Sequence, residues 1–359
     1  MTELHPLILA GAGHAHVVVL RRWVASGFRA PPGSLLLSPE ATTWYSGMMP
    51  GLLAGRFQPA DCAVDLAPLC RAAGIDWIDR GIAAVEPATA RIILDDGHAL
   101  AYRLLSFNVG SGIAAPEQLD DSVELIPAKP FDRLLTAYQR WQEAAAPARL
   151  MIIGGGASAF ELAVALQRSL PGTDVSMACS SGLLAGHAPG VGRRARRVLA
   201  ARGVALHENA HIKEAVDGML IGRDGRRWAA NAAVLATGSA AHAWQARSGL
   251  TCDERGFLRI GQTLACLDQP DVFATGDCAS LPQAPHAGVY ALRQGEVLAG
   301  NLQAALNGRP LRPYMPQRRA LALLATADGG AIASYGPLAF SGRWVGRWKD
   351  HLDLSFVRG

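Results

Sequence analysis

Two glycine-rich turns contain the residues whose types and spacing point most directly to chemistry. Gly11 and Gly13 follow one short apolar run, and Gly154 and Gly156 follow a second run 143 residues further along the chain. Glycine permits a tight bend with the backbone close to a pyrophosphate, while the amide groups and dipole of the following helix face the phosphate oxygens. Because each turn lies between a predicted strand and a predicted helix, we predict a dinucleotide site at both.

The third position of this fingerprint is not glycine in either turn. It is Ala159 in the second turn, which the motif tolerates, and His16 in the first. Two interpretations of His16 remain open: a hydrogen bond to a phosphate, or a side chain that fills the gap between helix and strand. His14 and His16 do not share a helix face, so we predict no metal site there.

Neither predicted site has the acidic residue that usually follows the second strand and binds the adenosine ribose. The chain continues with Ser38, Pro39 and Glu40 after the first such strand, and with residues 179–181 after the second. We therefore expect hydroxyl groups, backbone or Glu40 to bind the ribose. Further arginines would either hold a 2′-phosphate or lie solvated on a helix face, so NADH and NADPH both stay open. These are Arg193, Arg194, Arg196 and Arg197.

Length and composition limit the class of protein. The 359 residues predict two domains, and 50% apolar with 18% charged residues excludes a disordered chain. No apolar run approaches the roughly 18 residues of a membrane-spanning helix. The first residues do not resemble a secretion signal, so we expect a cytoplasmic protein. A net charge of +4 argues against nucleic-acid binding, and six scattered cysteines without a CxxC pair indicate no zinc site.

Three later segments give the glycine turns a recognisable context. An apolar strand ends at Thr237-Gly238, another ends at Gly276-Asp277, and a long helix begins at Ala287. This order resembles the pyridine nucleotide-disulphide oxidoreductase superfamily, flavoproteins with two dinucleotide-binding domains. The resemblance implies that the first turn holds FAD and the second NAD(P)H. It also implies that Asp277 lies near the FAD ribityl and pyrophosphate. The helix from Ala287 would stabilise reduced flavin with its amino end.

A closer resemblance involves residues 45–55, residues 11–16 and residues 318–324. Together they are similar to a branch found fused to selenophosphate synthetase and related to type II NADH dehydrogenases. Residues 38–55 contain no cysteine, so we expect no redox-active disulfide beside the flavin. Val289 replaces the first glutamine of the quinone-facing pattern of type II enzymes, and Arg293-Gln294 occupies the second region.

Glu161 is the candidate catalytic residue. Its segment, Phe160-Glu-Leu-Ala, is similar to the corresponding motif of type II NADH dehydrogenases. That resemblance puts the carboxylate beside the nicotinamide and the flavin, where it would orient the carboxamide or relay a proton. The alternative is an acid near a helix amino terminus that the helix dipole stabilises.

The resemblance also assigns binding residues. For FAD they are Gly11, Gly13, His14, Ala15, His16, Ser38, Pro39, Ser46, Gly47, Met48, Pro50, Ile82, Gly110, Ser111, Lys129, Gly276, Asp277, Ala287 and Gly288. For NAD(P)H they are Gly154, Gly156, Ala157, Ser158, Ala159, Thr237 and Gly238. No residue is assigned to a metal.

The carboxyl tail has a different pattern. Residues 320–336 predict a hairpin with its turn at 328–330. Trp344, Trp348, Leu352 and Phe356 then recur at every fourth residue. The flanking basic residues are Arg343, Arg347, Lys349 and Arg358. This composition is typical of an interfacial helix, which would allow peripheral contact with the inner face of the cell membrane. The alternative is a helix packed on the protein itself or on a homodimer partner.

We therefore predict an α/β protein with two Rossmann-like domains, the second inserted in the first. The FAD-binding domain would comprise residues 1–112 and 235–310, the NAD(P)H-binding domain residues 113–234, and the tail residues 311–359. The predicted function is hydride transfer from NAD(P)H to FAD, followed by electron transfer to a small-molecule acceptor, with quinone favoured. Two alternatives stay open: oxidation of sulfide or a selenium compound, and a non-catalytic flavin-binding accessory or sensor protein.

Overall fold

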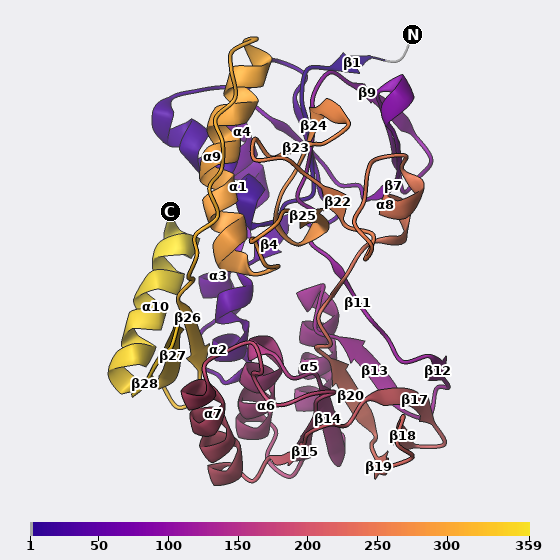
Figure 1. The fold of residues 1–359 in the computed structure, drawn as a ribbon, viewed down its shortest axis with the longest axis vertical. Coiled ribbons are helices and arrows are strands. Elements are labelled where there is room, and N and C mark those ends of the chain that lie inside the picture. Colours follow the sequence, from indigo (N-terminus) through magenta and orange to yellow (C-terminus); the bar gives the residue numbers. More distant parts are fainter. Residues whose placement is uncertain (1–2) are drawn as a thin grey trace. The chain divides into compact units, whose positions relative to one another are not determined.

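The computed structural model describes residues 3–359 and divides the chain into two compact units, each built around its own parallel sheet (Figure 1). Unit 1 comprises Met1–Thr43, Ala63–Gly112 and Ser239–Arg318. Unit 2 comprises Trp44–Cys62, Ile113–Gly238 and Arg319–Gly359.

The main sheet of unit 1 has six strands. Their order is β23 (Ala265–Cys266), β24 (Gln269–Ala274), β10 (Leu105–Phe107), β2 (Ile8–Ala10), β3 (Leu35–Leu37) and β6 (Asp76–Ile78). All neighbours are parallel except β23 and β24. The central strands are wholly apolar and buried, as expected for a parallel sheet covered on both faces. The carboxyl ends of β2, β10 and β24 therefore meet at one edge.

Two helices of unit 1 pack against each other beside this sheet: α1 (His14–Ser26) and α9 (Gly288–Leu306). Gly295 permits the close approach, because a Cβ atom there would lie 2.7 Å from the carbonyl oxygen of Ala15. The buried indole of Trp23 donates to the carbonyl oxygen of Ala299 at 3.0 Å, which fixes the register of the pair.

The remaining elements of unit 1 support this layer. Helix α4 (Leu66–Ala73) packs on α1 and is capped by Asp65, whose side chain accepts from the amide of Ala67. A second sheet has the order β1 (Leu4–His5), β9 (Ala99–Tyr102), β8 (Arg91–Leu94) and β7 (Ile82–Glu86). Helix α8 (Ala243–Arg247) packs near β7.

Unit 2 repeats the strand–turn–helix plan. Its parallel sheet has the order β13 (Glu124–Pro127), β20 (Ala232–Leu235), β14 (Arg149–Ile153), β15 (Asp174–Ala178) and β16 (Ala205–His207). The helices are α5 (Phe131–Glu143), α6 (Ala157–Ser169) and α7 (Pro189–Ala201). Helix α6 is buried on nearly all sides, since Phe160 and residues 162–166 lie in the core. A smaller sheet contains β12 (Gln118–Leu119), β17 (Ile212–Val216), β18 (Met219–Gly222) and β19 (Arg227–Ala229).

The carboxyl tail is part of unit 2. Strands β26 (Ala322–Ala325) and β27 (Ala331–Tyr335) form the predicted hairpin, and β28 (Leu338–Gly342) adds a third antiparallel strand that we did not predict. Helix α10 (Arg343–Arg358) then packs on this sheet (Figure 1). Gly346 is needed there, because a Cβ atom would overlap the carbonyl group of Gly329 in the hairpin turn.

The units differ from the predicted segments at several boundaries, of which two involve longer stretches. Residues 44–62, which we placed in the first part of the FAD-binding domain, cluster with unit 2. They contain η1 (Ser46–Met48), α2 (Met49–Leu53) and α3 (Pro59–Cys62). Leu53 packs in the core that contains Phe160, and the carbonyl oxygen of Leu53 accepts from the hydroxyl of Tyr138 at 2.9 Å. Residues 311–318, predicted as tail, cluster with unit 1, where the amide of Tyr314 donates to Gln262.

The other short elements complete the chain. They are β4 (Thr42–Trp44), β5 (Ala63–Asp65), η2 (Pro87–Thr89), β11 (Gly112–Ile113), β21 (Ser239–Ala240), β22 (Leu258–Arg259), η3 (Gly276–Cys278) and β25 (Ala279–Ser280).

Candidate functional site

The first glycine turn is shaped by a residue that the sequence analysis missed, Asn108, which follows β10. Gly11 has φ +88°, and a Cβ atom there would lie 2.6 Å from the carbonyl oxygen of Asn108. At Gly13 a Cβ atom would overlap the Asn108 side chain. Glycine is therefore required at both positions by the protein's own packing.

Asn108 also occupies the amino terminus of α1. Its Oδ1 atom accepts from the amides of Ala15 and His16 at 2.9 and 3.2 Å, and its Nδ2 atom donates to the carbonyl oxygen of Thr275 at 2.8 Å. The amides of Ala15 and His16, which we predicted to face a phosphate, are thus bonded to this side chain. The asparagine ties together the carboxyl ends of β10 and β24 and the start of α1.

The two interpretations of His16 are resolved by its hydrogen bonds. The ring is fully buried, with Nδ1 2.6 Å from the carbonyl oxygen of Gly11 and Nε2 2.9 Å from Oγ of Ser106. Since a carbonyl only accepts, Nδ1 donates and Nε2 accepts from the hydroxyl. Burial lowers the pKa of His16 to about 4, although the bond to Gly11 opposes the shift. His16 therefore fills the gap between helix and strand as a neutral ring, and no ring nitrogen is left for a phosphate.

Several predicted FAD residues lie together at this edge of unit 1. The amide of Gly276 donates to Oε1 of buried Gln294 at 2.7 Å, and Gly276 has φ +69° beside Asn108. Asp277 is half-buried and accepts from the hydroxyl of Ser239 at 3.5 Å. Helix α9 begins at Gly288, with Ala287, the predicted first residue, as its N-cap, and His14 lies within 4 Å of the Cβ position of Gly288.

The other residues of unit 1 that we assigned to FAD are two pairs in loops that follow strands of the main sheet and one residue in the second sheet. Ser38 and Pro39 follow β3 at the same sheet edge, and the Ser38 hydroxyl donates to the carbonyl oxygen of Glu40. Gly110 and Ser111 follow Asn108, and the buried Ser111 hydroxyl has no hydrogen-bond partner within residues 3–359. Ile82, in contrast, begins β7 in the second sheet.

Ser46, Gly47, Met48, Pro50 and Lys129 belong to unit 2. Met48 and Pro50, which we assigned to FAD binding, are buried inside unit 2. Met48 packs in a cluster with Cys62 that also contacts Phe57 and Leu354. The physical reason is that the 3-10 turn and α2 bury their apolar side chains inside unit 2. Lys129 is exposed just before α5.

The second glycine turn is more open. Gly154 has φ +149°, and a Cβ atom there would overlap the carbonyl oxygen of Ala236. In contrast, Gly156 is exposed, and within the described residues nothing lies within 4 Å of its Cβ position. Gly156 is the N-cap residue of α6 and has no side chain of its own to bond the first amides of the helix. The amino terminus of α6 can therefore receive a phosphate group.

The remaining predicted NAD(P)H residues surround this opening. Ala157 is half-buried and Ser158 exposed, whereas Ala159 is buried against the sheet. Thr237 donates its hydroxyl to the carbonyl oxygen of Ala114 at 2.7 Å. Gly238 has φ +101°, again with open space at its Cβ position among the described residues.

An acid that the sequence analysis missed lies beside the loop after β15. Oε1 of Glu208 accepts from the amide of Leu183 at 2.6 Å, and its carboxylate also accepts two bonds from Arg196. The hydrogen bond to Arg196 is the main reason that the pKa of Glu208 is lowered. Arg194 donates to the carbonyl oxygen of Gly190, while Arg193 and Arg197 are exposed. Glu208 immediately follows β16, one strand later than the usual ribose acid, which is why the motif did not reveal it.

Glu161 lies in a cluster of charged groups within unit 2. Its Oε1 atom accepts from the amide of Ala325 on β26 at 2.6 Å. Lys349 of α10 is buried, and its Nζ atom donates to Oδ2 of Asp353 at 2.8 Å and to the carbonyl oxygen of Gly47 at 2.7 Å. The Tyr45 side chain also hydrogen-bonds the Asp353 carboxyl group.

These groups perturb one another's proton affinities. Removal from water raises the pKa of Glu161 to about 7, an effect that the Lys349 charge and the Ala325 amide oppose and Asp353 reinforces. Burial alone would lower the pKa of Lys349, but the charges of Glu161 and Asp353 outweigh it, so that pKa is raised. Burial also raises the pKa of Asp353 against the opposing effect of Lys349. Glu161 can therefore exchange a proton near neutral pH.

The tail helix differs from the prediction in one respect. Lys349, expected among the exposed basic residues, lies on the buried face with Val345 and Asp353. Phe356 is half-buried, with its ring 4.5 Å from that of Tyr45. The spacing of Val345, Lys349 and Asp353 was a signal for this face, since residues four apart share one side of a helix.

The opposite face of α10 is exposed and aromatic. Trp344, Trp348 and Leu352 have exposed fractions of 53%, 41% and 42%. Leu338 and Phe340 of β28 are exposed as well, and the Phe340 and Trp344 rings lie 6.5 Å apart. The exposed basic residues are Arg343, Arg347 and Arg358.

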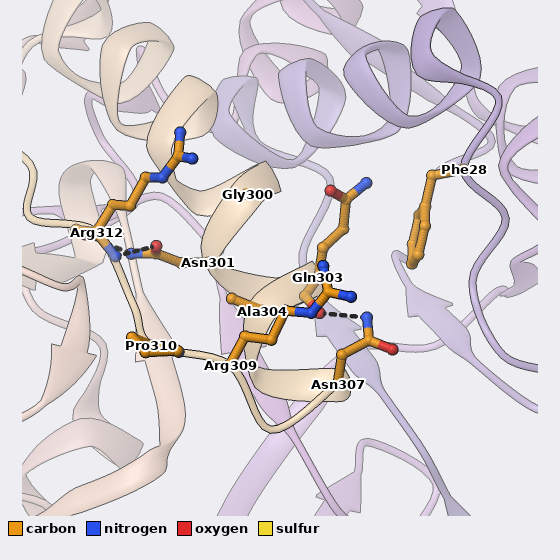
Figure 2. A pocket seen from close by; sticks show the side chains of 9 residues that line it. All are labelled: Phe28, Gly300, Asn301, Gln303, Ala304, Asn307, Arg309, Pro310 and Arg312. Carbon is orange, nitrogen blue, oxygen red and sulfur yellow. Dashed lines mark hydrogen bonds between the residues drawn. The ribbon is translucent and has the colours of Figure 1, made fainter.

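A separate hollow of about 380 Å³ lies in unit 1 at the carboxyl end of α9 (Figure 2). Asn301 on its wall is fully used: it donates to the carbonyl oxygens of Thr263 and Arg312 and accepts from the Arg312 amide. Gly300 is 12 residues, or about 18 Å of helix, from Gly288. This hollow is thus distinct from the nucleotide-binding edge of unit 1.

All six cysteines are free thiols. Within residues 3–359, no cluster of histidine, cysteine and acidic side chains is suited to a metal ion. No helix in this range is long and apolar enough to cross a bilayer.

Comparison with known proteins identifies the relatives of this chain. The profile of the family described as "Pyridine nucleotide-disulphide oxidoreductase" matches residues 9–295. Ferroptosis suppressor protein 1 of Taeniopygia guttata is 26% identical over 252 residues, which span 66% of this chain and 65% of that protein. The NADH dehydrogenase-like protein YutJ of Bacillus subtilis (strain 168) is 23% identical over 342 residues, covering 93% of this chain and 92% of that protein.

The fold has solved counterparts. The sulfide:quinone oxidoreductase of Aquifex aeolicus superposes with a TM-score of 0.79 at 15% identity, covering 99% of this chain and 91% of the other. This likeness concerns the fold. The profile match and the superposition confirm the predicted family and the predicted α/β class with two nucleotide-binding folds. The family match also bears out the predicted oxidoreductase class with its FAD and NAD(P)H cofactors.

Proposed function

Because the chain belongs to the pyridine nucleotide-disulphide oxidoreductase family, we propose that it is an NAD(P)H dehydrogenase that delivers electrons to a quinone. The observation that carries the proposal is the pair of strand–turn–helix folds, one in each unit, of which the second has an open glycine turn at Gly156. Bound flavin supplies the redox chemistry, because it accepts a hydride from the nicotinamide and passes electrons on.

The residues of unit 1 fit FAD. The buried Ser111 hydroxyl has no partner within residues 3–359, so it is available to a polar group of the cofactor. Asp277 in η3 offers an acceptor, and the amino terminus of α9 offers a positive dipole. Because Asn108 uses the amides of Ala15 and His16, we propose that the pyrophosphate contacts the loop backbone before them.

The residues of unit 2 fit NAD(P)H. The exposed turn at Gly156 and the amino terminus of α6 would bind the pyrophosphate. Glu208 beside the loop after β15 would accept from the ribose hydroxyls of NADH. It would disfavour NADPH, since a 2′-phosphate would lie near a carboxylate.

The proton balance of the proposed reaction requires one protein or solvent proton. Reduction of a quinone by NADH consumes NADH, one proton and the quinone, and yields NAD⁺ and the quinol. Glu161, with its pKa raised to about 7, is suited to hold that proton on its carboxyl group and to take another from solvent afterwards. Lys349 would keep the deprotonated carboxylate stable between turnovers.

The exposed face of α10 supports a membrane location for the acceptor. Two tryptophans, Leu352 and Phe340 form its apolar part, and Arg343 and Arg347 flank them. Such a face binds anionic lipid surfaces through apolar burial and charge attraction. We expect sedimentation with anionic vesicles but not with neutral ones, and a Trp344→Ala, Trp348→Ala double variant that stays in the supernatant. Equal sedimentation of both proteins would overturn this location.

The function is tested by anaerobic reduction followed by reoxidation. Addition of NADH to the flavin-loaded protein should bleach the flavin absorbance, and a soluble quinone should then restore it in stoichiometric amount. Flavin that NADH and NADPH leave oxidised, but that sulfide reduces, would replace the proposal with sulfide oxidation.

A further inference from the structure

The cluster around Lys349 contains one more acid than a simple ion pair needs. Glu161 and Asp353 are two carboxyl groups that share one ammonium group inside unit 2. If all three groups were charged, the cluster would carry a net charge of −1 at a site where Lys349 and Asp353 are buried and Glu161 is half-buried. Because burial penalises uncompensated charge, one of the carboxyl groups is expected to hold a proton.

The hydrogen bonds decide which carboxyl group stays ionised. Asp353 receives the Lys349 ammonium at 2.8 Å and the Tyr45 hydroxyl, so it has two donors, one of them charged. The bond that Glu161 receives is neutral, from the backbone amide of Ala325. Donors stabilise the ionised form of a carboxyl group. Asp353 is therefore the better place for the negative charge, and Glu161 the better place for the proton.

We propose that Asp353, oriented by Tyr45, is a positioning residue that holds the Lys349 charge away from Glu161 and so keeps a proton on Glu161 near neutral pH. This inference deepens the proposed function, because it names the group that sets the pH range of the proton donor. Asp353 acts through Lys349 and is not itself assigned a contact with substrate.

The groups that face the cluster come from four elements. Ala325 lies on β26, Lys349 and Asp353 on α10, Tyr45 immediately before η1, and Cys62 on α3. Burial raises the pKa of the Cys62 thiol to about 12, so it remains neutral. Asp350 also acts on Lys349 and Asp353, but it pairs with Arg56 at 2.6 Å.

The test is an infrared titration of the purified holoprotein from pH 5 to pH 9. The stretching band of a protonated carboxyl group, assigned to Glu161 by its absence in Glu161→Gln, should titrate near pH 7 in the native protein. In Asp353→Asn, Lys349 loses its hydrogen-bonded counter-ion and its charge acts more strongly on Glu161, so the band should titrate at least one pH unit lower. That shift is a tenfold loss of the protonated form above the midpoint.

Two further variants keep the result interpretable. Asp350→Asn removes a carboxylate from the same helix and should leave the titration within about 0.3 pH units of the native value, because Asp350 is paired with Arg56. Tyr45→Phe is the milder variant, because it removes only the hydroxyl group. It keeps the inference testable if the Asp353→Asn protein does not fold. It should move part of the proton from Glu161 to Asp353, with a weaker Glu161 band at pH 7.

An Asp353→Asn or Tyr45→Phe protein in which the Glu161 band titrates as in the native chain would overturn the inference. So would an upward shift. The infrared band is read without turnover, so failure of NADH to reduce the flavin would contradict the proposed function while leaving this test valid. Where turnover is present, the falling limb of its pH profile should shift with the band.

Discussion

The two glycine turns have the same sequence signature but different surroundings. In unit 1, Gly11 and Gly13 lie against Asn108, whose side chain bonds the first amides of α1. In unit 2, Gly154 lies against Ala236, but Gly156 faces open space among the described residues. Glycine is thus present in this motif for two different physical reasons. Gly11, Gly13 and Gly154 accommodate the protein's own atoms, whereas Gly156 meets open space, where the proposed function places the nucleotide.

The largest expected effect is that of Gly13→Ala, which tests whether the first turn needs glycine for packing against Asn108. The new methyl group would overlap the Asn108 side chain, so its three hydrogen bonds would distort. We expect a loss of about 3 kcal/mol in the free energy of unfolding, measured by urea denaturation. Gly300→Ala is the matched control in the same unit, because it meets open space on a helix and should stabilise the protein. Equal stability of the two variants would contradict the packing role of Gly13.

A second prediction concerns His16, whose counterpart in the second turn is Ala159. Burial lowers its pKa from the usual 6.5 to about 4 in the folded protein. The unfolded chain therefore binds the proton more tightly, and stability falls as pH decreases from about 6.5 towards 4. Between pH 7 and pH 5 the loss should be about 2 kcal/mol.

His16→Gln provides the comparison for this effect, because glutamine takes up no proton. The pH dependence of urea denaturation should be smaller in the variant by that amount. Identical slopes in the two proteins would mean that His16 is already charged in the native state.

Gly156→Ala tests the second turn, where we expect an effect on nucleotide binding and almost none on stability. A Cβ atom there meets no atom of the described residues within 4 Å, so unfolding should change by less than about 0.5 kcal/mol. The methyl group would instead occupy the space next to the pyrophosphate, and we expect KM for NADH to rise at least tenfold, about 1.4 kcal/mol. Gly186→Ala, also in open space in unit 2, should leave KM unchanged. An unaltered KM for NADH in Gly156→Ala would contradict nucleotide binding at this turn.

The smallest expected effect distinguishes the two nucleotides. Glu208→Gln removes the carboxylate beside the loop after β15 and releases Arg196. The ratio of kcat/KM for NADPH to that for NADH should rise about fivefold, or about 1 kcal/mol. Glu117→Gln breaks the exposed pair with Arg223 and serves as the control. A ratio that stays constant in Glu208→Gln would show that this acid does not face the ribose.

The sequence was most informative where local pattern determines structure. Glycine between an apolar strand and a helix predicted both turns, and the apolar spacing predicted the tail helix and the hairpin, because these features depend on near neighbours. Asn108, Glu208 and Asp353 were missed for the opposite reason. Asn108 caps a helix 93 residues away, and Lys349 bonds a carbonyl 302 residues away. Such pairings arise from the tertiary fold and leave no periodic signal.

The tail illustrates the same limit within one helix. The fourfold spacing of Trp344, Trp348, Leu352 and Phe356 predicted an apolar stripe. The first three are exposed, whereas Phe356 is half-buried against Tyr45. Lys349 carries the same charge as its arginine neighbours, so composition alone placed it with them. Its burial follows from Gly346, which brings α10 against the hairpin turn and sets Lys349 facing Gly47.

The measurement that tests the central claim most directly is the anaerobic titration of flavin-loaded protein with NADH, followed by absorbance. We predict complete bleaching at one equivalent of NADH per flavin in the native chain. Gly156→Ala should need a much higher NADH concentration at the same flavin content. Flavin that stays oxidised in the native chain with excess NADH and with excess NADPH would contradict the claim that unit 2 binds a nucleotide able to reduce it.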